Sequence, residues 1–270
     1  MIRIFSILVG LFFTVALAWS FVNGAYTAAT EPAAETVEHA FHKHPKEVHF
    51  ASDGALGHFD RQQLQRGFQV YKEVCANCHS MRLVAFRDLA ALGYSEAEVK
   101  AIAAQGPKQA TFDPKTGDRG ERTSLPADRF PPVYYAGQGT PPDLSLITKA
   151  RHDGGAYVYS LLTGYAQQPA ELLKKFPDAK TPAGLYYNPY FANLNIAMAP
   201  PLADGQVGYS DGTKASVDQM SKDVSAFLIW AAEPKMDKRK QTGWPVLGFL
   251  LFATILGYLA YRNVWAGTKH

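Results

Sequence analysis

Cys75-Ala76-Asn77-Cys78-His79 is a C-x-x-C-H motif, and its two cysteines are the only ones in the chain. Thiols three positions apart can add to the two vinyl groups on one edge of a porphyrin, and the following histidine can then bind the iron. A redox C-x-x-C belongs beside a βαβ pattern, which this region does not show, and a zinc site needs two further ligands at suitable spacing. The motif therefore predicts one haem c, attached covalently through two thioethers, with His79 as an axial ligand.

The N-terminal segment is apolar from Ile2 to Val22 and carries only Arg3 as a charge. A basic start, an apolar run and a small-x-small cleavage site at 16–18 are typical of a secretory signal. The run also reaches the length of about 20 residues that crosses a bilayer. We therefore interpret residues 1–24 as a signal peptide or a retained N-terminal anchor, and residues 25–46, which lack periodicity, as a linker.

A second uncharged run, residues 244–261, predicts a transmembrane helix between a basic juxtamembrane segment, 235–243, and a short tail, 262–270. The excess of basic residues just before this helix would place the main domain in the cytoplasm. Long domains, however, cross membranes largely regardless of charge, and haem attachment to C-x-x-C-H normally occurs outside the cytoplasm. Arg and Ser are too scarce at the N-terminus for a mitochondrial transit peptide. We expect a bacterial inner membrane protein with residues 47–234 in the periplasm and the tail in the cytoplasm.

The composition indicates a helical, loop-rich domain. The chain is 47% hydrophobic, and its 22 Gly and 17 Pro indicate many turns. Apolar periodicity and capping residues predict helices at Arg61–Val74, Ser95–Gln105, Tyr157–Leu162 and Val217–Ala232, another helix starting at Pro141–Ser145, and a long loop over 106–142. The expected fold class is all-α. The net charge of +3 arises at the ends of the chain, which gives no indication of nucleic acid binding.

The iron position opposite His79 either takes a second axial ligand or stays open. A methionine there keeps the iron six-coordinate and raises its potential, whereas an open position can bind small ligands. Met198 lies in a proline-flanked loop that can fold over the ring. Three other methionines are less suitable. Met81 is too close to His79 to reach the opposite face of the ring, Met220 belongs to an apolar helix face, and Met236 lies at the membrane edge. Met198 is therefore the favoured ligand, with His152 or an open site as alternatives.

Several stretches taken together resemble the cytochrome c1 family, the haem subunits of the cytochrome bc1 complex. The stretches that carry the resemblance follow the family order: Arg66–Cys75, Cys78–Met81, Pro141–Ser145, Lys149–His152, Ser160–Tyr165, Tyr187–Phe191, Ile196–Pro201 and Trp230–Pro234, then basic residues and one membrane helix. The resemblance covers about residues 45–265. It implies a cytochrome c-like haem domain with a C-terminal transmembrane helix.

The resemblance also implies roles for individual residues. Met198 would be the sixth iron ligand, and Tyr157 would pack against the ring. Arg151 would lie near a haem propionate, for which a guanidinium is a suitable partner. Pro141 and Pro142 would line the haem crevice.

As function, the resemblance implies electron transfer from the Rieske iron–sulfur protein, through the haem, to a soluble or membrane-tethered c-type cytochrome. The complex would be dimeric and would include cytochrome b and membrane lipid. Such a subunit performs no bond chemistry of its own. Four acidic residues are candidates for attracting a basic cytochrome: Asp204, Asp211, Asp218 and Asp223.

The chain departs from the family pattern at two places. Residues 136–139 stand where an Asn-rich stretch is usual. Ala166 stands where a cysteine is often seen, so the second cysteine pair that braces the methionine loop in some relatives cannot form. Two alternative functions stay open on the residues alone. One is a membrane-anchored haem sensor or enzyme with an open sixth position, and the other is a structural subunit in which haem only stabilises the fold.

Overall fold

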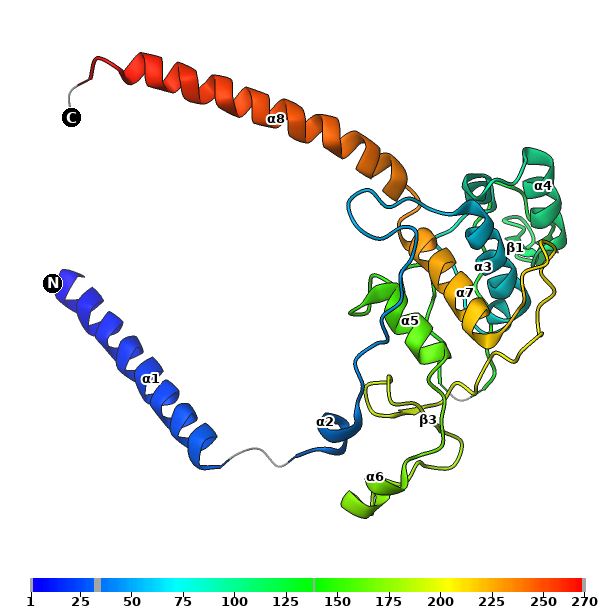
Figure 1. Cartoon of the computed structure of the whole chain (residues 1–270), viewed down its shortest axis with the longest axis horizontal. Helices are drawn as coiled ribbons and strands as arrows, with labels where there is room; N and C mark the ends of the chain where they lie inside the picture. The colour runs from blue at the N-terminus through cyan, green and yellow to red at the C-terminus, as the bar shows by residue number, and fades with distance from the viewer. Residues whose placement is uncertain (1, 32–34, 138, 269–270) are drawn as a thin grey trace.

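The computed structural model describes residues 2–31, 35–137 and 139–268, in which helices and irregular loops predominate over short strands (Figure 1). The predicted loop-rich, helical fold is confirmed, although two small hairpins depart from a strictly all-α chain. The sequence predictions for Met1, residues 32–34, Gln138 and residues 269–270 lie outside the described residues.

Two amphipathic helices form the centre of the body. They are α3, Arg61–Glu73, and α7, Val217–Ala232, and both match their predicted ranges closely. Asp60 caps α3 by accepting hydrogen bonds from the amides of Gln62 and Gln63, and Ser216 caps α7 by accepting one from Gln219. These caps satisfy amides that have no partner within the helix, which fixes where each helix starts.

Helices α3 and α7 cross in direct contact at Gly67. A Cβ atom at this position would lie 2.1 Å from the backbone oxygen of Asp223 and 2.6 Å from Cβ of Phe227. The close approach brings together a buried aromatic cluster formed by Phe68, Tyr71, Phe86, Phe130, Phe227 and Trp230. Because α3 leads directly into the C-x-x-C-H motif, this packing holds the motif against the core.

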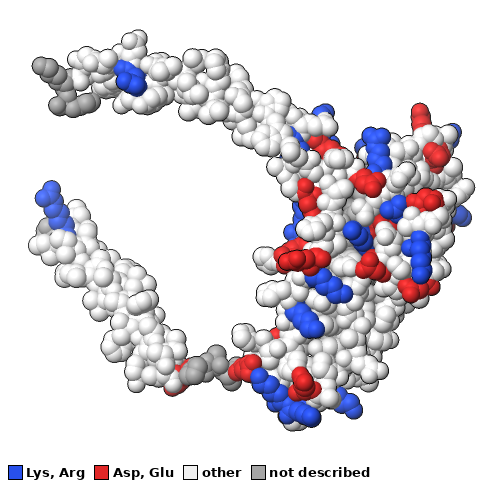
Figure 2. Space-filling view, viewed as in Figure 1, with Lys and Arg blue, Asp and Glu red and all other residues white. Residues whose placement is uncertain are grey.

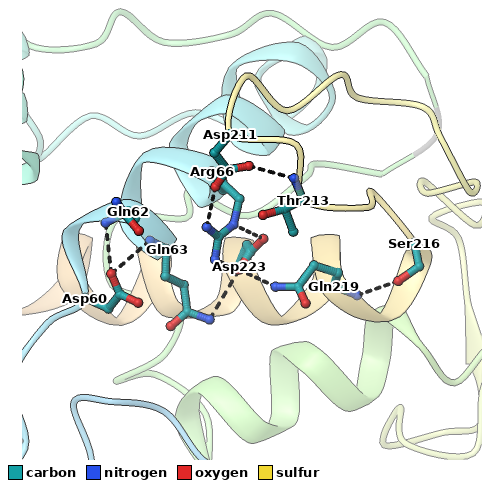
Figure 3. Close-up of polar contacts among 9 residues, drawn as sticks. All are labelled: Asp60, Gln62, Gln63, Arg66, Asp211, Thr213, Ser216, Gln219 and Asp223. Atoms are coloured by element: carbon teal, nitrogen blue, oxygen red, sulfur yellow. Dashed lines mark hydrogen bonds and ion pairs between the residues drawn. The ribbon is translucent and has the colours of Figure 1, made fainter.

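A buried ion pair joins the same two helices (Figure 3). Arg66 on α3 donates to the fully buried carboxylate of Asp223 on α7 at 2.9 Å and to Asp211 at 2.7 Å. Gln63 and Gln219 also donate to Asp223. Burial opposes the charge on Arg66, but its hydrogen bonds to the two carboxylates outweigh this effect and raise its pKa.

These contacts revise the predicted docking role of the four acidic residues. Asp223 is fully buried, so it cannot meet a partner, and its assignment as a docking residue was wrong. Asp211 binds Arg66, Asp204 accepts a hydrogen bond from the Val217 amide at 2.7 Å, and Asp218 accepts one from the Tyr159 hydroxyl. All four carboxylates therefore have structural partners within the chain.

The region between the motif and helix α5, Gly154–Leu162, is more ordered than the sequence predicted. After the 3₁₀ helix η2, Phe86–Leu92, helix α4, Glu96–Gln105, begins with the expected capping box of Ser95 and Glu98. Strands β1, Gln109–Phe112, and β2, Arg119–Arg122, then form an antiparallel hairpin inside the segment that was predicted to be a loop. Asp113 accepts hydrogen bonds from the amides of Lys115 and Thr116, and this side-chain turn makes the hairpin possible.

The helix predicted to start at Pro141–Ser145 does not form, and residues 144–150 make successive turns instead. The carboxylate of Asp143 accepts a hydrogen bond from the amide two residues later, in Ser145, which forms a turn. In addition, the Leu144 amide donates to Ser80 on another segment. The helix α5, Gly154–Leu162, starts three residues earlier than predicted.

A smaller unit lies beside α5 and contains the Met198 loop. Its elements are α2, Val37–Phe41, α6, Ala170–Lys175, β3, Tyr186–Tyr187, and β4, Asn195–Ile196, with β3 and β4 paired antiparallel. Their side chains form what we call the satellite cluster: Leu172, Tyr187 and Leu194, with Val37, Phe41, Leu173 and Ala179 packed against them. Helix α2 falls within the predicted linker, where no helix was expected.

Two long helices extend from the body, and each contains a long, exposed apolar stretch with little charge (Figures 1 and 2). They are α1, Ile2–Thr30, and α8, Met236–Trp265, and by length and composition both could cross a membrane. Both are longer than the segments 1–24 and 244–261 that the sequence indicated.

The start of α8 is fixed to the body by several contacts. The ammonium group of Lys240 donates to the backbone oxygens of Ser52, Gly54 and Gly57 at 2.7–3.0 Å. Asp237 accepts a hydrogen bond from the Phe59 amide, and Met236 is buried. The basic juxtamembrane segment, predicted as 235–243, is thus mostly the first turns of α8 and is anchored to residues 52–59.

A candidate haem site

The C-x-x-C-H motif follows α3 as a tight turn. Cys75–Asn77 form a 3₁₀ helix, and the Cys75 backbone oxygen accepts hydrogen bonds from the amides of Cys78 at 3.1 Å and His79 at 2.9 Å. The Asn77 side chain donates back to the carbonyls of Glu73 and Val74. The turn therefore fixes the spacing between both thiols and the histidine.

Both cysteines are half-buried and neither forms a disulfide. Burial, with a smaller contribution from Cys78, raises the pKa of the Cys75 thiol to about 12, so this thiol is protonated at neutral pH. Within the described ranges, no group of three or more His, Cys, Asp and Glu side chains converges on one point. Both thiols are free of disulfide bonds and are therefore available for attachment to a porphyrin.

The orientation of His79 is set by a proline carbonyl. Nδ1 of His79 lies 2.8 Å from the backbone oxygen of Pro142. Because a carbonyl can only accept a hydrogen bond, Nδ1 must carry a proton, and in the neutral ring Nε2 then has the free lone pair. This is the tautomer that can bind a metal through Nε2, with a second group fixing the ring. The donor set therefore fits a haem iron.

Further hydrogen bonds fasten the Pro141–Ser145 segment to the residues after His79. The Leu144 amide donates to the Ser80 carbonyl at 2.8 Å, and the Ser145 hydroxyl accepts from the Leu83 amide at 3.0 Å. Asp143 accepts from the amide of Arg82 at 3.0 Å and from its guanidinium at 3.1 Å. Burial would raise the pKa of Asp143, but these bonds and those from Ser145 outweigh it and lower the pKa.

A cavity of about 310 Å³ lies next to the motif. Cys78, Pro141 and Tyr135 contribute to its lining, and Pro132 and Val133 add apolar wall. The structure thus brings the Pro142 carbonyl to His79 and places Pro141 and Cys78 in the wall of one cavity. The stretch 136–139, where the chain departs from the family pattern, includes Gln138, which lies outside the described residues.

Among the methionines that the structure describes, Met198 alone is not buried in the protein interior. Met81 and Met220 are fully buried and Met236 is nearly so, whereas Met198 is half-buried in its loop. The hydroxyl of Tyr165 donates to the Met198 carbonyl at 3.0 Å and fixes the loop. Burial, followed by the effects of Tyr157 and Tyr186, raises the pKa of Tyr165.

The remaining candidates are less constrained. Arg151 is exposed, and its guanidinium donates to the carbonyl of Ala150 at 3.0 Å. His152, the alternative sixth ligand, is exposed as well. Sequence reasoning missed the support given by Ser80, Ser145 and Tyr165. The Asp-Leu-Ser spacing at 143–145 contains a signal for the side-chain turn, but no local pattern indicates the contact of Tyr165 with Met198.

A helical, loop-rich body with a C-x-x-C-H motif directly after a core helix defines the class of c-type cytochromes. A model of the cytochrome C1 family matches residues 50–268. The chain is 43% identical over 239 residues to "Cytochrome c1" of Rhodospirillum rubrum, covering 80% of this chain and 86% of that protein.

Two eukaryotic relatives are similarly close. The chain is 41% identical over 272 residues to "Cytochrome c1 1, heme protein, mitochondrial" of Arabidopsis thaliana, with 94% of this chain and 82% of the relative covered. It is 40% identical over 252 residues to "Cytochrome b-c1 complex catalytic subunit, mitochondrial" of Candida albicans, with 89% and 83% covered. The chain therefore belongs to the cytochrome C1 family.

Proposed function

We propose that this chain is the haem-carrying electron-transfer subunit of a quinol–cytochrome c oxidoreductase. It would accept one electron at a time from the Rieske iron–sulfur protein and pass it to a soluble or membrane-tethered c-type cytochrome. The observation that carries the proposal is the C-x-x-C-H motif, whose His79 bonds through Nδ1 to the Pro142 carbonyl, in a member of the cytochrome C1 family. The names of its relatives include a haem protein and a b-c1 complex subunit.

The chain's own residues would hold one haem c. The thiols of Cys75 and Cys78 would each add across one vinyl group to form a thioether, and His79 and Met198 would be the axial ligands. When bound, the haem supplies a one-electron redox couple. Pro141, Pro142 and Tyr157 would keep water from the ring, and Arg151 would pair with a propionate.

The protein's contribution is to position and tune this couple. A thioether opposite an imidazole favours the reduced iron and raises the potential, and an apolar crevice acts in the same direction. No residue of the chain needs to donate or accept a proton during electron transfer. We therefore regard the chain as an electron carrier within an oxidoreductase complex rather than as an enzyme on its own.

The location follows from the apolar helices. Helix α8 would anchor the body in a bacterial inner membrane, with residues 47–234 in the periplasm and the tail in the cytoplasm. Helix α1 would serve as the export signal or as a second anchor. Cytochrome b would be the neighbouring membrane subunit, lipid would cover the rest of α8, and the complex would be a dimer.

The ligand assignment is tested with Met198→Leu, and Met220→Leu, a buried methionine of α7, is the matched control. The Met198 variant should keep one covalently attached haem by intact mass but show a lower midpoint potential, because leucine has no sulfur to bind iron. The control should retain the wild-type potential. Equal potentials in both variants would refute Met198 as a ligand, and a purified chain without covalent haem would refute the function.

A further inference from the structure

The segment before the haem domain packs onto the unit that carries Met198, although the sequence indicated only a linker. We call residues 35–46 the N-terminal strap. We infer that this strap positions the Met198 loop and, through it, keeps the sixth iron position closed. The inference rests on the proposed function, since it assumes that Met198 is the axial ligand.

Lys46 makes the most specific contacts of the strap. Its ammonium group donates to the side-chain oxygen of Thr163 at 2.7 Å and to the Thr163 carbonyl at 3.2 Å. Its backbone amide donates to the hydroxyl of Ser160, a fully buried residue, at 2.8 Å. The ammonium also lies 5.8 Å from the ring centre of Tyr159 and 5.6 Å from that of Tyr190. One lysine thus connects the end of α5 to the segment that follows β3.

The first half of the strap packs on the satellite cluster. Phe41 meets Phe176 edge-on, with ring centres 6.3 Å apart, and Val37 contributes to the same cluster. Lys175 forms an ion pair with Glu35, and the Lys43 amide donates to the Pro189 carbonyl at 2.8 Å. The strap is therefore attached along its length by apolar and polar contacts.

Two short routes lead from the strap to Met198. The first runs from Lys46 to Thr163 and then, two residues on, to Tyr165, whose hydroxyl holds the Met198 carbonyl. The second runs through the satellite cluster to Leu194, which is buried and lies only four residues before Met198. Figure 1 shows α2 next to α6, with the chain then rising alongside α5.

The residues around Gly164 and Asn188, which lie between these two routes, are tightly packed. A Cβ atom on Gly164 would lie 2.4 Å from the Tyr190 ring and 2.6 Å from the Ser160 carbonyl. Asn188, fully buried, donates to the Leu161 carbonyl at 2.8 Å and accepts from the Tyr190 amide at 3.1 Å. Displacement of Lys46 or of the strap would therefore be transmitted to the Met198 loop rather than absorbed locally.

The strap also offers a physical substitute for a covalent link. With only two cysteines, both in the haem motif, this chain cannot cross-link the segment around Ala166. Charge-assisted hydrogen bonds from Lys46 restrict the same segment without a disulfide. The positioning function is thus distributed over Lys46 and Phe41 rather than over a second cysteine pair.

The test measures how often the sixth position opens. Carbon monoxide binds ferrous haem only when the methionine has left the iron, so its binding rate reports the open population. Lys46→Met keeps the aliphatic stem but removes the ammonium group, and we expect the rate to rise about tenfold or more. Lys46→Arg, which restores a cation and donors, should return the rate toward wild type. The midpoint potential should fall in Lys46→Met.

Matched controls separate positioning from a general loss of charge or apolar surface. Lys43→Met removes a lysine with an exposed side chain from the same strap, and Phe112→Ala removes a phenylalanine that is 65% exposed on the β1–β2 hairpin. Both controls should bind carbon monoxide at the wild-type rate. Phe41→Ala should bind it faster, as Lys46→Met does. Should Lys46→Met not accumulate, hydrogen exchange of residues 186–196 in Phe41→Ala measures the same loosening.

The possible results separate the proposed function from the positioning role of the strap. Rapid carbon monoxide binding by the unaltered protein would show an open site and would refute the proposed function. A closed wild-type site, with Lys46→Met and Phe41→Ala indistinguishable from their controls, would overturn the strap and leave the function intact. Increased binding in both variants, reversed by Lys46→Arg, would support the inference.

Discussion

The two predicted iron ligands, His79 and Met198, are held in place by different kinds of contacts. His79 follows a helix that crosses α7 at Gly67, beside a buried aromatic cluster and a buried ion pair. Met198 follows a two-residue strand in a unit whose cluster has only Leu172, Tyr187 and Leu194 as buried members. The first side is held mainly by apolar packing, and the second mainly by hydrogen bonds between distant segments. We therefore expect substitutions on the first side to lower global stability and those on the second to act locally.

The largest effect is expected for Arg66→Met on the His79 side. Asp223 would remain buried without its cation, and the free energy of unfolding should fall by about 3 kcal/mol or more. Arg122→Met is the matched control, because the Arg122–Asp128 pair is partly exposed and solvent screening should leave it only a small contribution to stability. Chemical denaturation followed by circular dichroism measures both. Equal losses in the two variants would contradict the role assigned to the buried pair.

Gly67→Ala should follow, with a loss of about 1–3 kcal/mol. The new methyl group would press on the Asp223 backbone at 2.1 Å, so α3 and α7 would have to separate. Gly208→Ala is the control, since nothing lies within 4 Å of a Cβ atom there. The same denaturation experiment compares them. A Gly67 variant as stable as the Gly208 variant would show that the helices do not cross so closely.

A smaller and local effect is expected for Asn188→Ala on the Met198 side. Loss of its hydrogen bonds to Leu161 and Tyr190 should cost about 1–3 kcal/mol. This loss should lower the free energy of local opening around the satellite cluster rather than that of global unfolding. Hydrogen exchange should accelerate in residues 186–196 while α3 and α7 stay protected. Asn193→Ala, at an exposed position of the same loop, should change exchange less. Uniform acceleration across the chain would contradict the division into two regions.

The smallest effect concerns Asp143, which fastens the proline segment next to His79. Its pKa lies below the usual 3.8, so its contribution is complete above that value and is lost as the pH falls through the lowered folded pKa. Asp143→Asn should cost about 1 kcal/mol at neutral pH. In thermal unfolding, the difference from wild type should vanish once the pH has fallen below the lowered folded pKa of Asp143. Asp178→Asn, at an exposed position, is the control. If the stability difference between Asp143→Asn and wild type did not depend on pH, the carboxylate could not be its source.

Local patterns in the sequence predicted most of the His79 side. The motif itself, the Asp60 cap of α3, the Ser95–Glu98 capping box and the period of α7 all depend on residues within a few positions of one another. The Met198 side depends on long-range contacts such as Lys46 with Thr163, which no local pattern encodes. For the same reason α2 was missed, because its five residues are held by the satellite cluster.

Two errors have specific physical causes. The helix expected after Pro141–Ser145 fails because Asp143 and Leu144 bond to the segment after His79 instead of capping a helix. Asp223 was considered for docking because acidic residues are usually exposed, whereas this one is neutralised by Arg66 inside the core. In both places a tertiary partner outweighs the local preference of the residue.

The anchorage of Lys240 has a mechanical consequence. With its ammonium group held by three backbone oxygens and Asp237 bound to the Phe59 amide, the body cannot swing freely about the start of α8. Residues 52–59 and the first turns of α8 therefore move as one piece. If α8 spans a membrane as proposed, a tilt of this helix would tilt the whole body with it.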